Sequence, residues 1–210
     1  MEMDVLLLAG GENRRMQGRF KGSLALTEDG DGGSFLERLI EELTPHAHAI
    51  RISGPETLRE RFPGIPVVAD IYPGAGPASG LQAGLAASDT DWTATAACDM
   101  PCLTWELFDF LRRQADLENA DAVFPTLQGR CHPLAGLYHR RLSPVLEDAI
   151  RRGDRKILAA LHGRQICCIP VDEQPSLIPM LMNINTPEEY RRYLKERSCR
   201  CFQTEEKGDE

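Results

Sequence analysis

Short runs of apolar residues recur along this 210-residue chain. The first, Asp4–Ala9, is a continuous run that ends at the glycine pair Gly10-Gly11. Runs of this kind are typical of strands that are buried on both faces of a parallel sheet. The same pattern predicts strands over residues 4–9, 49–53, 65–69, 92–98, 121–124 and 166–171.

Amphipathic segments lie between these predicted strands. Apolar residues repeat there at helical spacing, as in Phe35, Leu36, Leu39, Ile40 and Leu43, and again in Leu107, Phe108 and Leu111. Strands that alternate with helices form βαβ units, so we expect an α/β fold with a mostly parallel central sheet and helices on both faces. No repeat and no Pro/Gly-rich linker divides the sequence. This predicts a single domain over residues 1–198, followed by a flexible polar tail over 199–210.

Two helix starts are marked by their capping residues. Ser143-Pro144 supplies an N-cap and a first-turn proline, and Gly153 is expected to end that helix. Thr186-Pro187-Glu188-Glu189 combines a capping box with proline at the first helical position. We therefore expect helices to begin at these two points.

The composition limits the class of protein. Hydrophobic residues make up 42% of the chain and charged residues 27%, as in a soluble globular domain. The formal net charge of −8 argues against a nucleic-acid binder, which usually carries a basic face. No apolar run approaches the ~20 residues that span a bilayer. The first residues also lack the basic region of a signal peptide, so we expect a cytoplasmic protein with no membrane contact.

The seven cysteines do not suggest a disulfide framework, because their number is odd and no Cys-x-x-Cys occurs. Cys98 and Cys102 are close in sequence, but no second pair with usable spacing accompanies them. We interpret the cysteines as small thiols that pack in the interior. A thiol-ligated metal protein is the alternative, and it predicts bound zinc or iron.

The segment after the first strand, residues 10–22, is basic within an acidic chain. It contains four cations, Arg14, Arg15, Arg19 and Lys21, and one anion, Glu12. The glycine pair Gly10-Gly11 lets backbone N–H groups approach an anion, and the cations offset the charge of a polyphosphate. We predict a phosphate-binding loop at the carboxyl end of the first strand, although a solvated surface loop would show the same composition. The segment does not match the Walker A pattern.

Two aspartates follow predicted strands. Asp99 ends a strand of small residues, where it could bridge a magnesium ion to bound phosphates. The alternative is that Asp99 caps the helix that begins near Thr104, although Thr104 is itself the better cap. Asp70 follows another strand and either holds a base or ribose or starts a turn.

Asn183 and Asn185 flank an apolar residue shortly before the last predicted helix. On an extended segment their side chains point to the same side. Both amides could donate hydrogen bonds to phosphate or bind magnesium through their carbonyl oxygens, while Asn185 could instead only shape the helix entry. His132 either faces a substrate or is an ordinary loop histidine.

These segments together resemble the molybdenum cofactor guanylyltransferase family, which transfers GMP from GTP to molybdopterin. Each motif is weak alone, but the matches are ordered and spread over nearly the whole chain. They comprise Leu8–Met16 followed by Lys21-Gly22, then Val68–Asp70, Gly76–Gly80, Ala97–Pro101, His132–Leu134 and Asn183–Glu189.

The resemblance implies a Rossmann-like nucleotidyltransferase fold and specific roles for the matching residues. Leu8, Ala9 and Gly10 would contact the guanine nucleotide through backbone groups, and Lys21 would bind its phosphates. Asp70 would contact the nucleoside, and Asp99 would hold Mg²⁺. Asn183 and Asn185 match an asparagine pair near the reacting phosphates and the pterin, where His132 could also lie. The sequence departs from the family pattern at Gln17, Gly18, Phe20 and Ser53.

The expected reaction is an in-line displacement in which a molybdopterin phosphate oxygen attacks the α-phosphorus of GTP. Mg²⁺, Lys21 and the loop arginines, Arg15 among them, would carry catalysis by positioning and charge stabilisation. The implied partners are GTP and molybdopterin, with transient contacts to other cofactor-biosynthesis proteins, and we expect a monomer. One alternative is another nucleotidyltransferase of the same fold, either a cytidylyltransferase for molybdopterin or an enzyme that acts on a sugar or polyol phosphate. The other alternative is a nucleotide-binding regulator without turnover.

Overall fold

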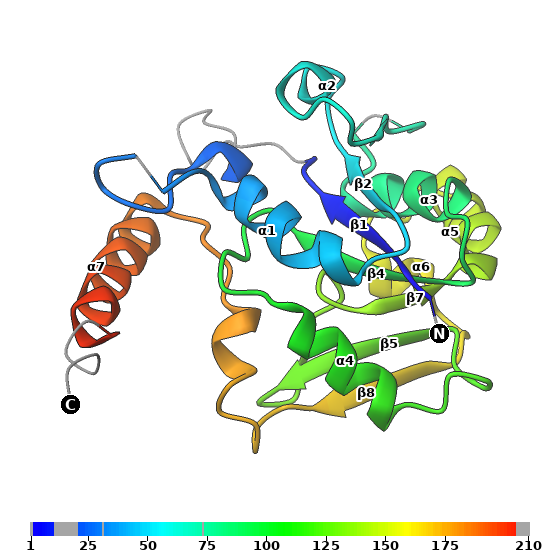
Figure 1. Ribbon diagram of the computed structural model, residues 1–210. Helices are drawn as coiled ribbons and strands as arrows, with labels where there is room; N and C mark the ends of the chain where they lie inside the picture. The colour runs from blue at the N-terminus through cyan, green and yellow to red at the C-terminus, as the bar shows by residue number, and fades with distance from the viewer. Residues whose placement is uncertain (1, 11–20, 31, 73, 205–210) are drawn as a thin grey trace.

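The computed structural model describes residues 2–10, 21–30, 32–72 and 74–204, with side chains described as far as residue 196. Among these residues the chain forms a central sheet covered by helices (Figure 1). The strands are β1 (Asp4–Leu8), β2 (Ile50–Ser53), β3 (Val67–Val68), β4 (Trp92–Ala97), β5 (Ala122–Leu127), β6 (Arg130–Cys131), β7 (Leu137–His139) and β8 (Ile166–Pro170).

The strand order is β3-β2-β1-β4-β7-β5-β6, with β8 paired to β5. Neighbours are parallel from β3 to β4 and between β5 and β8, whereas β7 and β6 run antiparallel to their neighbours. The mostly parallel α/β fold is therefore confirmed. The sequence pattern did not predict β6 and β7, because strands of two and three residues are too short to produce a recognisable apolar run.

Seven helices lie among the described residues: α1 (Phe35–Leu43), α2 (Leu58–Arg61), α3 (Pro77–Ala86), α4 (Trp105–Gln114), α5 (Ser143–Arg151), α6 (Ile157–Ala160) and α7 (Pro187–Thr204). Short 3-10 turns are η2 (Lys21–Ser23), η3 (Thr44–His46), η4 (Arg140–Leu142) and η5 (Ile178–Leu181). No helix in the described part of the chain is both long and apolar enough to cross a membrane.

The alternating side chains of β1 join the two layers of the core. Val5 and Leu7 pack with the apolar residues of α1 and α4 on one face of the sheet. Leu6 and Leu8 pack on the other face, against α3, α5 and α6. Both sets are at most 6% exposed, which explains why the strand reads as a continuous apolar run.

Helix α7 lies beside this two-layered body rather than on its sheet (Figure 1). A smaller core of Leu24, Leu26 and Phe35 packs there with Ile184, Tyr193 and Leu194. The helix extends through residues 199–204, so the predicted start of the polar tail falls inside it. The division of the chain into a domain and a tail stays a prediction.

The two predicted helix starts have different outcomes. At α7 the capping box is confirmed, since the amide of Glu189 donates to the Thr186 hydroxyl and the Glu189 carboxylate accepts from the Thr186 amide. The prediction of Ser143 as an N-cap is wrong, because η4 runs directly into α5 and Leu142 occupies the cap position. Ser143 is buried instead and donates to the carbonyl of Gln82 at 3.3 Å.

Candidate active site at the carboxyl edge of the sheet

The parallel strands β1, β2, β3 and β4 all end at one edge of the sheet, here called the carboxyl edge. From β1 the chain continues to its neighbour β2 and then to β3, and it returns across the sheet to place β4 on the other side of β1. The strand order therefore reverses direction between β1 and β4. In open α/β sheets, ligands bind in the crevice outside the carboxyl ends at such a point.

Four predicted residues meet at this point, and we call them the Lys21 cluster: Lys21, Asp99, Asn183 and Asn185. The Lys21 ammonium donates to Asp99 Oδ2 at 2.8 Å and to Asn185 Oδ1 at 2.6 Å. The side-chain amide of Asn183 donates from Nδ2 to Asp99 Oδ1 at 2.9 Å. The side chains of Lys21 and Asp99 are 18% and 13% exposed, so a ligand can still reach them while bulk water screens them little.

The four members of the cluster come from three different parts of the chain. Lys21 begins η2, and Asp99 follows the end of β4. The two asparagines lie on the segment between η5 and α7, where the amide of Ile184 donates to the carbonyl of Asp99 at 2.8 Å. Because Ile184 is buried in the small core under α7, its two neighbours project their amides toward Asp99 and Lys21.

Asp99 does not cap a helix in this structure, since its carboxylate is engaged by Lys21 and Asn183. Thr104 does occupy the N-cap position of α4. Its hydroxyl makes no cap hydrogen bond and donates to the sulfur of Met180 instead. The alternative that Asp99 caps the helix beginning near Thr104 is therefore wrong.

Cys98 immediately precedes Asp99 in the chain and is buried. Burial, with the nearby charge of Asp99, raises the pKa of its thiol to about 12. The thiol is therefore neutral at physiological pH, as is usual for a cysteine that packs in an apolar interior. Among the described cysteines, the interpretation as interior thiols holds for Cys98, whereas Cys102, Cys131 and Cys167 are only partly buried and Cys168 is exposed.

A second group of predicted residues surrounds Asp70. The Ser53 hydroxyl donates to Asp70 Oδ1 at 3.3 Å, and burial raises the pKa of the Asp70 carboxyl. A Cβ atom at Gly80 would lie 2.3 Å from Ser53 Oγ, so α3 can approach this carboxylate only through a glycine. A Cβ built on Gly10 would lie 3.8 Å from Asp70 Oδ2, which places Asp70 beside the chain that leaves β1.

The predicted nucleotide contacts at the end of β1 differ in exposure. The carbonyl of Leu8 accepts from the amide of Cys98, and the amide of Ala9 donates to the carbonyl of Ser53. Leu8 and Ala9 are buried, whereas Gly10 is exposed. A ligand at this edge would therefore meet Gly10 before the other two. The predicted residues Gly11 and Arg15 lie outside the described residues.

His132 is half-buried in the turn after β6, where its amide donates to the carbonyl of Pro125 at 3.0 Å. Burial, and then the charge of Arg130, lower the pKa of its imidazole, so the ring is neutral at pH 7. None of the hydrogen bonds among the described residues connects this ring to the Lys21 cluster. Its predicted place beside a substrate stays a prediction.

The oxygen atoms of the cluster fit a magnesium ion. Each carboxylate oxygen of Asp99 accepts one hydrogen bond in the structure, which leaves a lone pair on each. Mg²⁺ prefers oxygen ligands and is commonly held by one or two carboxylates together with substrate phosphates and water. The part of the chain that the structure describes contains no group of three or more His, Cys, Asp or Glu side chains arranged to hold a metal ion.

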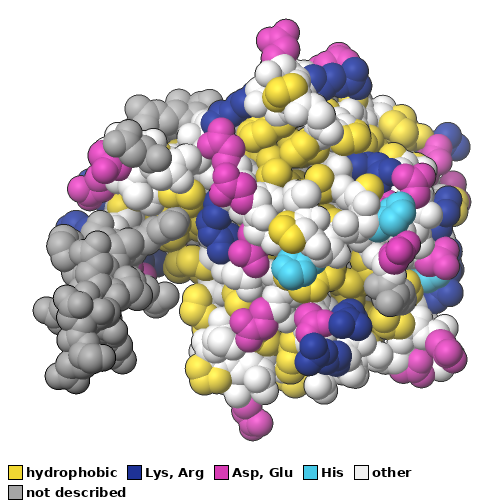
Figure 2. Space-filling model, viewed as in Figure 1, with side chains coloured by type: hydrophobic (Ala, Val, Ile, Leu, Met, Phe, Trp, Pro, Cys, Tyr) yellow, Lys and Arg dark blue, Asp and Glu magenta, His cyan; other side chains and the backbone are white. Residues whose placement is uncertain are grey.

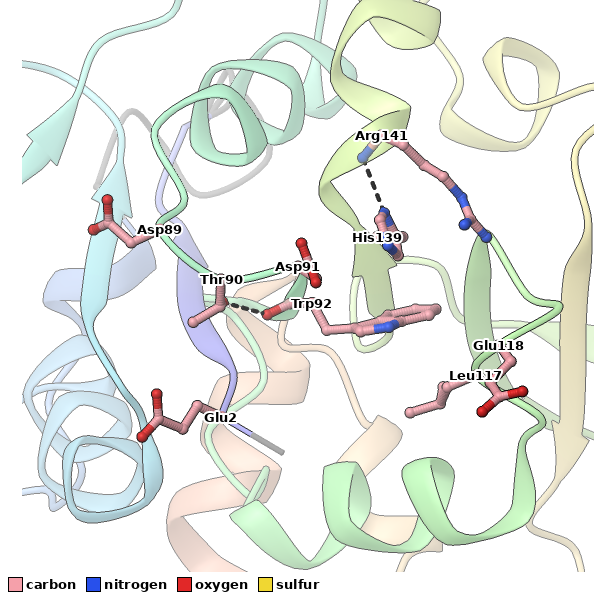
Figure 3. A pocket seen from close by; sticks show the side chains of 9 residues that line it. All are labelled: Glu2, Asp89, Thr90, Asp91, Trp92, Leu117, Glu118, His139 and Arg141. Atoms are coloured by element: carbon pink, nitrogen blue, oxygen red, sulfur yellow. Dashed lines mark hydrogen bonds between the residues drawn. The ribbon is translucent and has the colours of Figure 1, made fainter.

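A hollow of about 570 Å³ at the opposite edge of the sheet does not suit a triphosphate (Figure 3). Four carboxylates line it, from Glu2, Asp89, Asp91 and Glu118, and they would repel an anionic ligand. Acidic and basic side chains are interspersed over the described residues of the face in Figure 2. The carboxyl edge is thus the best-supported site for a nucleotide.

Sequence reasoning identified the members of the Lys21 cluster but missed Glu189 as a part of its support. The carboxylate of Glu189 accepts from the amide of Asn185 at 2.7 Å. The capping-box motif beside the asparagine pair was the available signal, because it places Glu189 at the end of the segment that carries both amides.

Comparison with known proteins connects this chain to a family. The model of the MobA-like NTP transferase domain family matches residues 5–166. A protein of Bacillus cereus named probable molybdenum cofactor guanylyltransferase is 30% identical over 198 residues, which cover 92% of this chain and 96% of that protein. The molybdenum cofactor guanylyltransferase of Vibrio atlanticus is also 30% identical, over 90% of this chain and 93% of its own length.

Solved structures of known proteins are also similar to this chain. Molybdopterin-guanine dinucleotide biosynthesis protein A from Archaeoglobus fulgidus superimposes with a TM-score of 0.79 at 27% identity, covering 93% of this chain and 99% of that one. The 2-C-methyl-D-erythritol 4-phosphate cytidylyltransferase of Thermus thermophilus has a TM-score of 0.65 at 17% identity, over 94% of this chain and 100% of its own. At that identity the likeness concerns the fold alone.

Proposed function

Because the chain belongs to the MobA-like NTP transferase family, among the molybdenum cofactor guanylyltransferases, we propose that it transfers GMP from GTP to the terminal phosphate of molybdopterin. Diphosphate would be released, and molybdopterin guanine dinucleotide would form. At the coarser level, the chain is a nucleotidyltransferase of molybdenum cofactor biosynthesis. We propose GTP and molybdopterin as its substrates and Mg²⁺ as the metal ion that it uses.

One observation carries the proposal. A lysine, a carboxylate and two amides converge at the reversal of strand order, where this class of sheet binds ligands. Lys21 supplies a positive charge for the phosphates, and Asp99 supplies the hard oxygen atoms that a phosphate-bound divalent ion requires. A regulator that only bound the nucleotide would have less need of such a carboxylate beside the phosphates.

The proposed chemistry is an in-line displacement at the α-phosphorus of GTP. The molybdopterin phosphate is ionised near neutral pH, so its oxygen needs no strong general base. The oxygen forms a bond to the α-phosphorus while the bond to the β-phosphate oxygen breaks, and diphosphate leaves with the electron pair. The main obstacles are repulsion between the two anions and the charge that accumulates on the leaving group.

The residues of this chain would lower those obstacles by position and charge. Lys21 would bind the triphosphate and offset its charge, as would Arg15. Asp99 would hold Mg²⁺, with Asn183 and Asn185 offering amide oxygens beside it. When bound, Mg²⁺ would neutralise phosphate charge and orient the reacting groups.

The two substrates would lie on either side of Lys21. Asp70, held by Ser53 beside Gly10, would contact the nucleoside, because its oxygen atoms can accept hydrogen bonds from ribose or base. Asn183, Asn185 and His132 would face the molybdopterin. A neutral imidazole at His132 can both donate and accept a hydrogen bond.

The proposal is tested by turnover with purified protein, molybdopterin and Mg²⁺, using GTP, CTP or ATP in parallel. We expect the guanine dinucleotide and diphosphate to form with GTP, at a rate well above that with CTP. Preferred use of CTP would overturn the guanylyl assignment and favour a cytidylyltransferase. Binding of GTP without any diphosphate release would favour a regulator.

Assembly and location are part of the same proposal. We propose a cytoplasmic monomer that contacts other cofactor-biosynthesis proteins transiently to receive or deliver the pterin. Light scattering coupled to size exclusion would give the mass of one chain. A stable dimer in that measurement would contradict the monomer.

A further inference from the structure

The carboxylate of Glu189 makes one hydrogen bond more than a helix cap requires. In a capping box, the acidic side chain accepts from the backbone amide of the N-cap residue, which here is Thr186 at 3.0 Å. The same oxygen, Oε2, also accepts from the amide of Asn185 at 2.7 Å. The shorter of the two bonds therefore comes from Asn185, the residue that precedes the N-cap.

This additional bond fixes a residue that contacts Lys21. The side chain of Asn185 accepts from the Lys21 ammonium at 2.6 Å, and Lys21 donates in turn to Asp99 at 2.8 Å. One residue earlier, the amide of Ile184 is bound to the carbonyl of Asp99 at 2.8 Å. The backbone of Asn185 is thus held between Asp99 on one side and the first turn of α7 on the other.

We infer that Glu189 is a positioning residue for Lys21, acting through the backbone of Asn185; this inference rests on the proposed function. Loss of the carboxylate would leave two half-buried amides without their acceptor and would free the backbone of Asn185 to rotate. The oxygen that fixes the Lys21 ammonium would then shift relative to Asp99. Displacement of a catalytic group by about 1 Å can cost on the order of 10²-fold in rate.

A set of single substitutions separates positioning from helix stability. Glu189→Ala removes both bonds, whereas Glu189→Gln keeps an amide oxygen as an acceptor. Thr186→Ala removes the acceptor of the Glu189 amide and so weakens the helix cap, but it leaves the bond to Asn185 in place. Glu188→Ala is the matched control, because this neighbouring exposed residue pairs only with Arg191 among the contacts described for it.

Two readouts are measured on the full-length chain. The first is hydrogen exchange of the Asn185 and Thr186 amides, which requires no substrate. The second is steady-state GMP transfer with GTP, molybdopterin and Mg²⁺. In Glu189→Ala we expect both amides to exchange at least tenfold faster and kcat to fall about tenfold or more. The Gln variant should stay within threefold of wild type in both readouts.

Thr186→Ala should lower the melting temperature while kcat stays within threefold of wild type. Glu188→Ala should change neither the melting temperature nor kcat. Equal kcat in Glu189→Ala and Glu188→Ala would overturn the inference, as would unchanged exchange of the Asn185 amide. An equal loss of kcat in Thr186→Ala and Glu189→Ala would also overturn it, because helix stability alone would then explain both. Absence of GMP transfer by the wild type would instead overturn the proposed function.

Discussion

Lys21 and Asp99 are 78 positions apart in sequence, yet their charged atoms lie 2.8 Å apart. Both could be singled out from the sequence, because each follows a strand that the apolar pattern identifies. In a parallel sheet such strand ends meet at one edge, so the approximate proximity of the two residues also follows. The hydrogen bond from Ser53 to Asp70 and the bond from the Asn185 amide to Glu189 were not predicted, since they depend on rotamers and on the path of short loops.

Replacement of Asp99 should have the largest effect of any single substitution in the cluster. Asp99→Asn keeps the shape of the side chain but removes its negative charge and one of its acceptors. We expect the rate of GMP transfer to fall by about 10²–10³-fold, the range found when one charge-stabilising group is removed from an active site. The measurement is kcat at saturating GTP and Mg²⁺.

Asp116→Asn serves as the control for that substitution, because Asp116 is exposed and belongs to a distant turn. It should keep the wild-type rate. If Asp99→Asn remained within a few-fold of wild type, Asp99 would not be a metal ligand of the reaction.

Removal of the Lys21 ammonium should weaken the interaction with the triphosphate. Lys21→Ala removes the charge that we propose binds the phosphates, so we expect kcat/KM for GTP to fall by about 10²-fold. Titration calorimetry with GTP and Mg²⁺ would show whether binding is affected as well as turnover. A wild-type kcat/KM in this variant would remove Lys21 from the site.

At the scale of elements, α3 explains much of how the site is supported. Gly80 lets this helix approach Ser53 and Asp70, and Gly84 lets it approach β1, where a Cβ atom would lie 2.2 Å from Leu6 Cδ2. The sequence resemblance included the segment Gly76–Gly80, which leads into this helix. The close contact with the sheet could not be predicted, because it depends on how far α3 lies from two strands.

An alanine at Gly84 should therefore destabilise the fold. Leu6 is buried on all sides, so its side chain can move only by displacing its neighbours. Overpacking of this kind costs about 1–3 kcal/mol of unfolding free energy. Urea denaturation would measure the loss in Gly84→Ala, with Ala86→Ser on the exposed face of the same helix as the control. A midpoint equal to that of the control would show that α3 can shift to accommodate the methyl group.

At the scale of the whole molecule, the two edges of the sheet have different tasks. The carboxyl edge carries the candidate site, whereas the opposite edge is tied together by buried Asp4. Its carboxylate accepts from Arg51 Nη1 at 2.6 Å, from the Ser88 hydroxyl at 2.8 Å and from the Asp89 amide at 2.9 Å. The composition and apolar pattern predicted the overall architecture, but not this network, which joins residues that are unremarkable in the sequence.

These hydrogen bonds predict how stability depends on pH. Burial alone would raise the pKa of Asp4, but the bonds from Asp89, Ser88 and His48, with the charge of Arg51, hold it below 3.8. A carboxyl whose pKa is lower in the folded than in the unfolded state stabilises the fold above the unfolded pKa. That contribution is lost as the pH falls through the folded pKa.

We therefore expect the unfolding free energy to decrease as the pH falls below about 4, the usual range of an unfolded aspartate. Asp4→Asn should be less stable than wild type at pH 7, and the difference should shrink toward pH 3. Urea unfolding of both proteins at several pH values would test this. A constant difference between them across that range would contradict the role assigned to Asp4.

The bond between Lys21 and Asn185 joins positions 164 residues apart. A ribosome therefore completes the first strand, Lys21 itself and most of the sheet long before it adds the partner of that lysine. A nascent chain that has folded its sheet still lacks the two asparagines that complete the cluster. The order of synthesis thus delays assembly of the site until the segment that leads into α7 has been made.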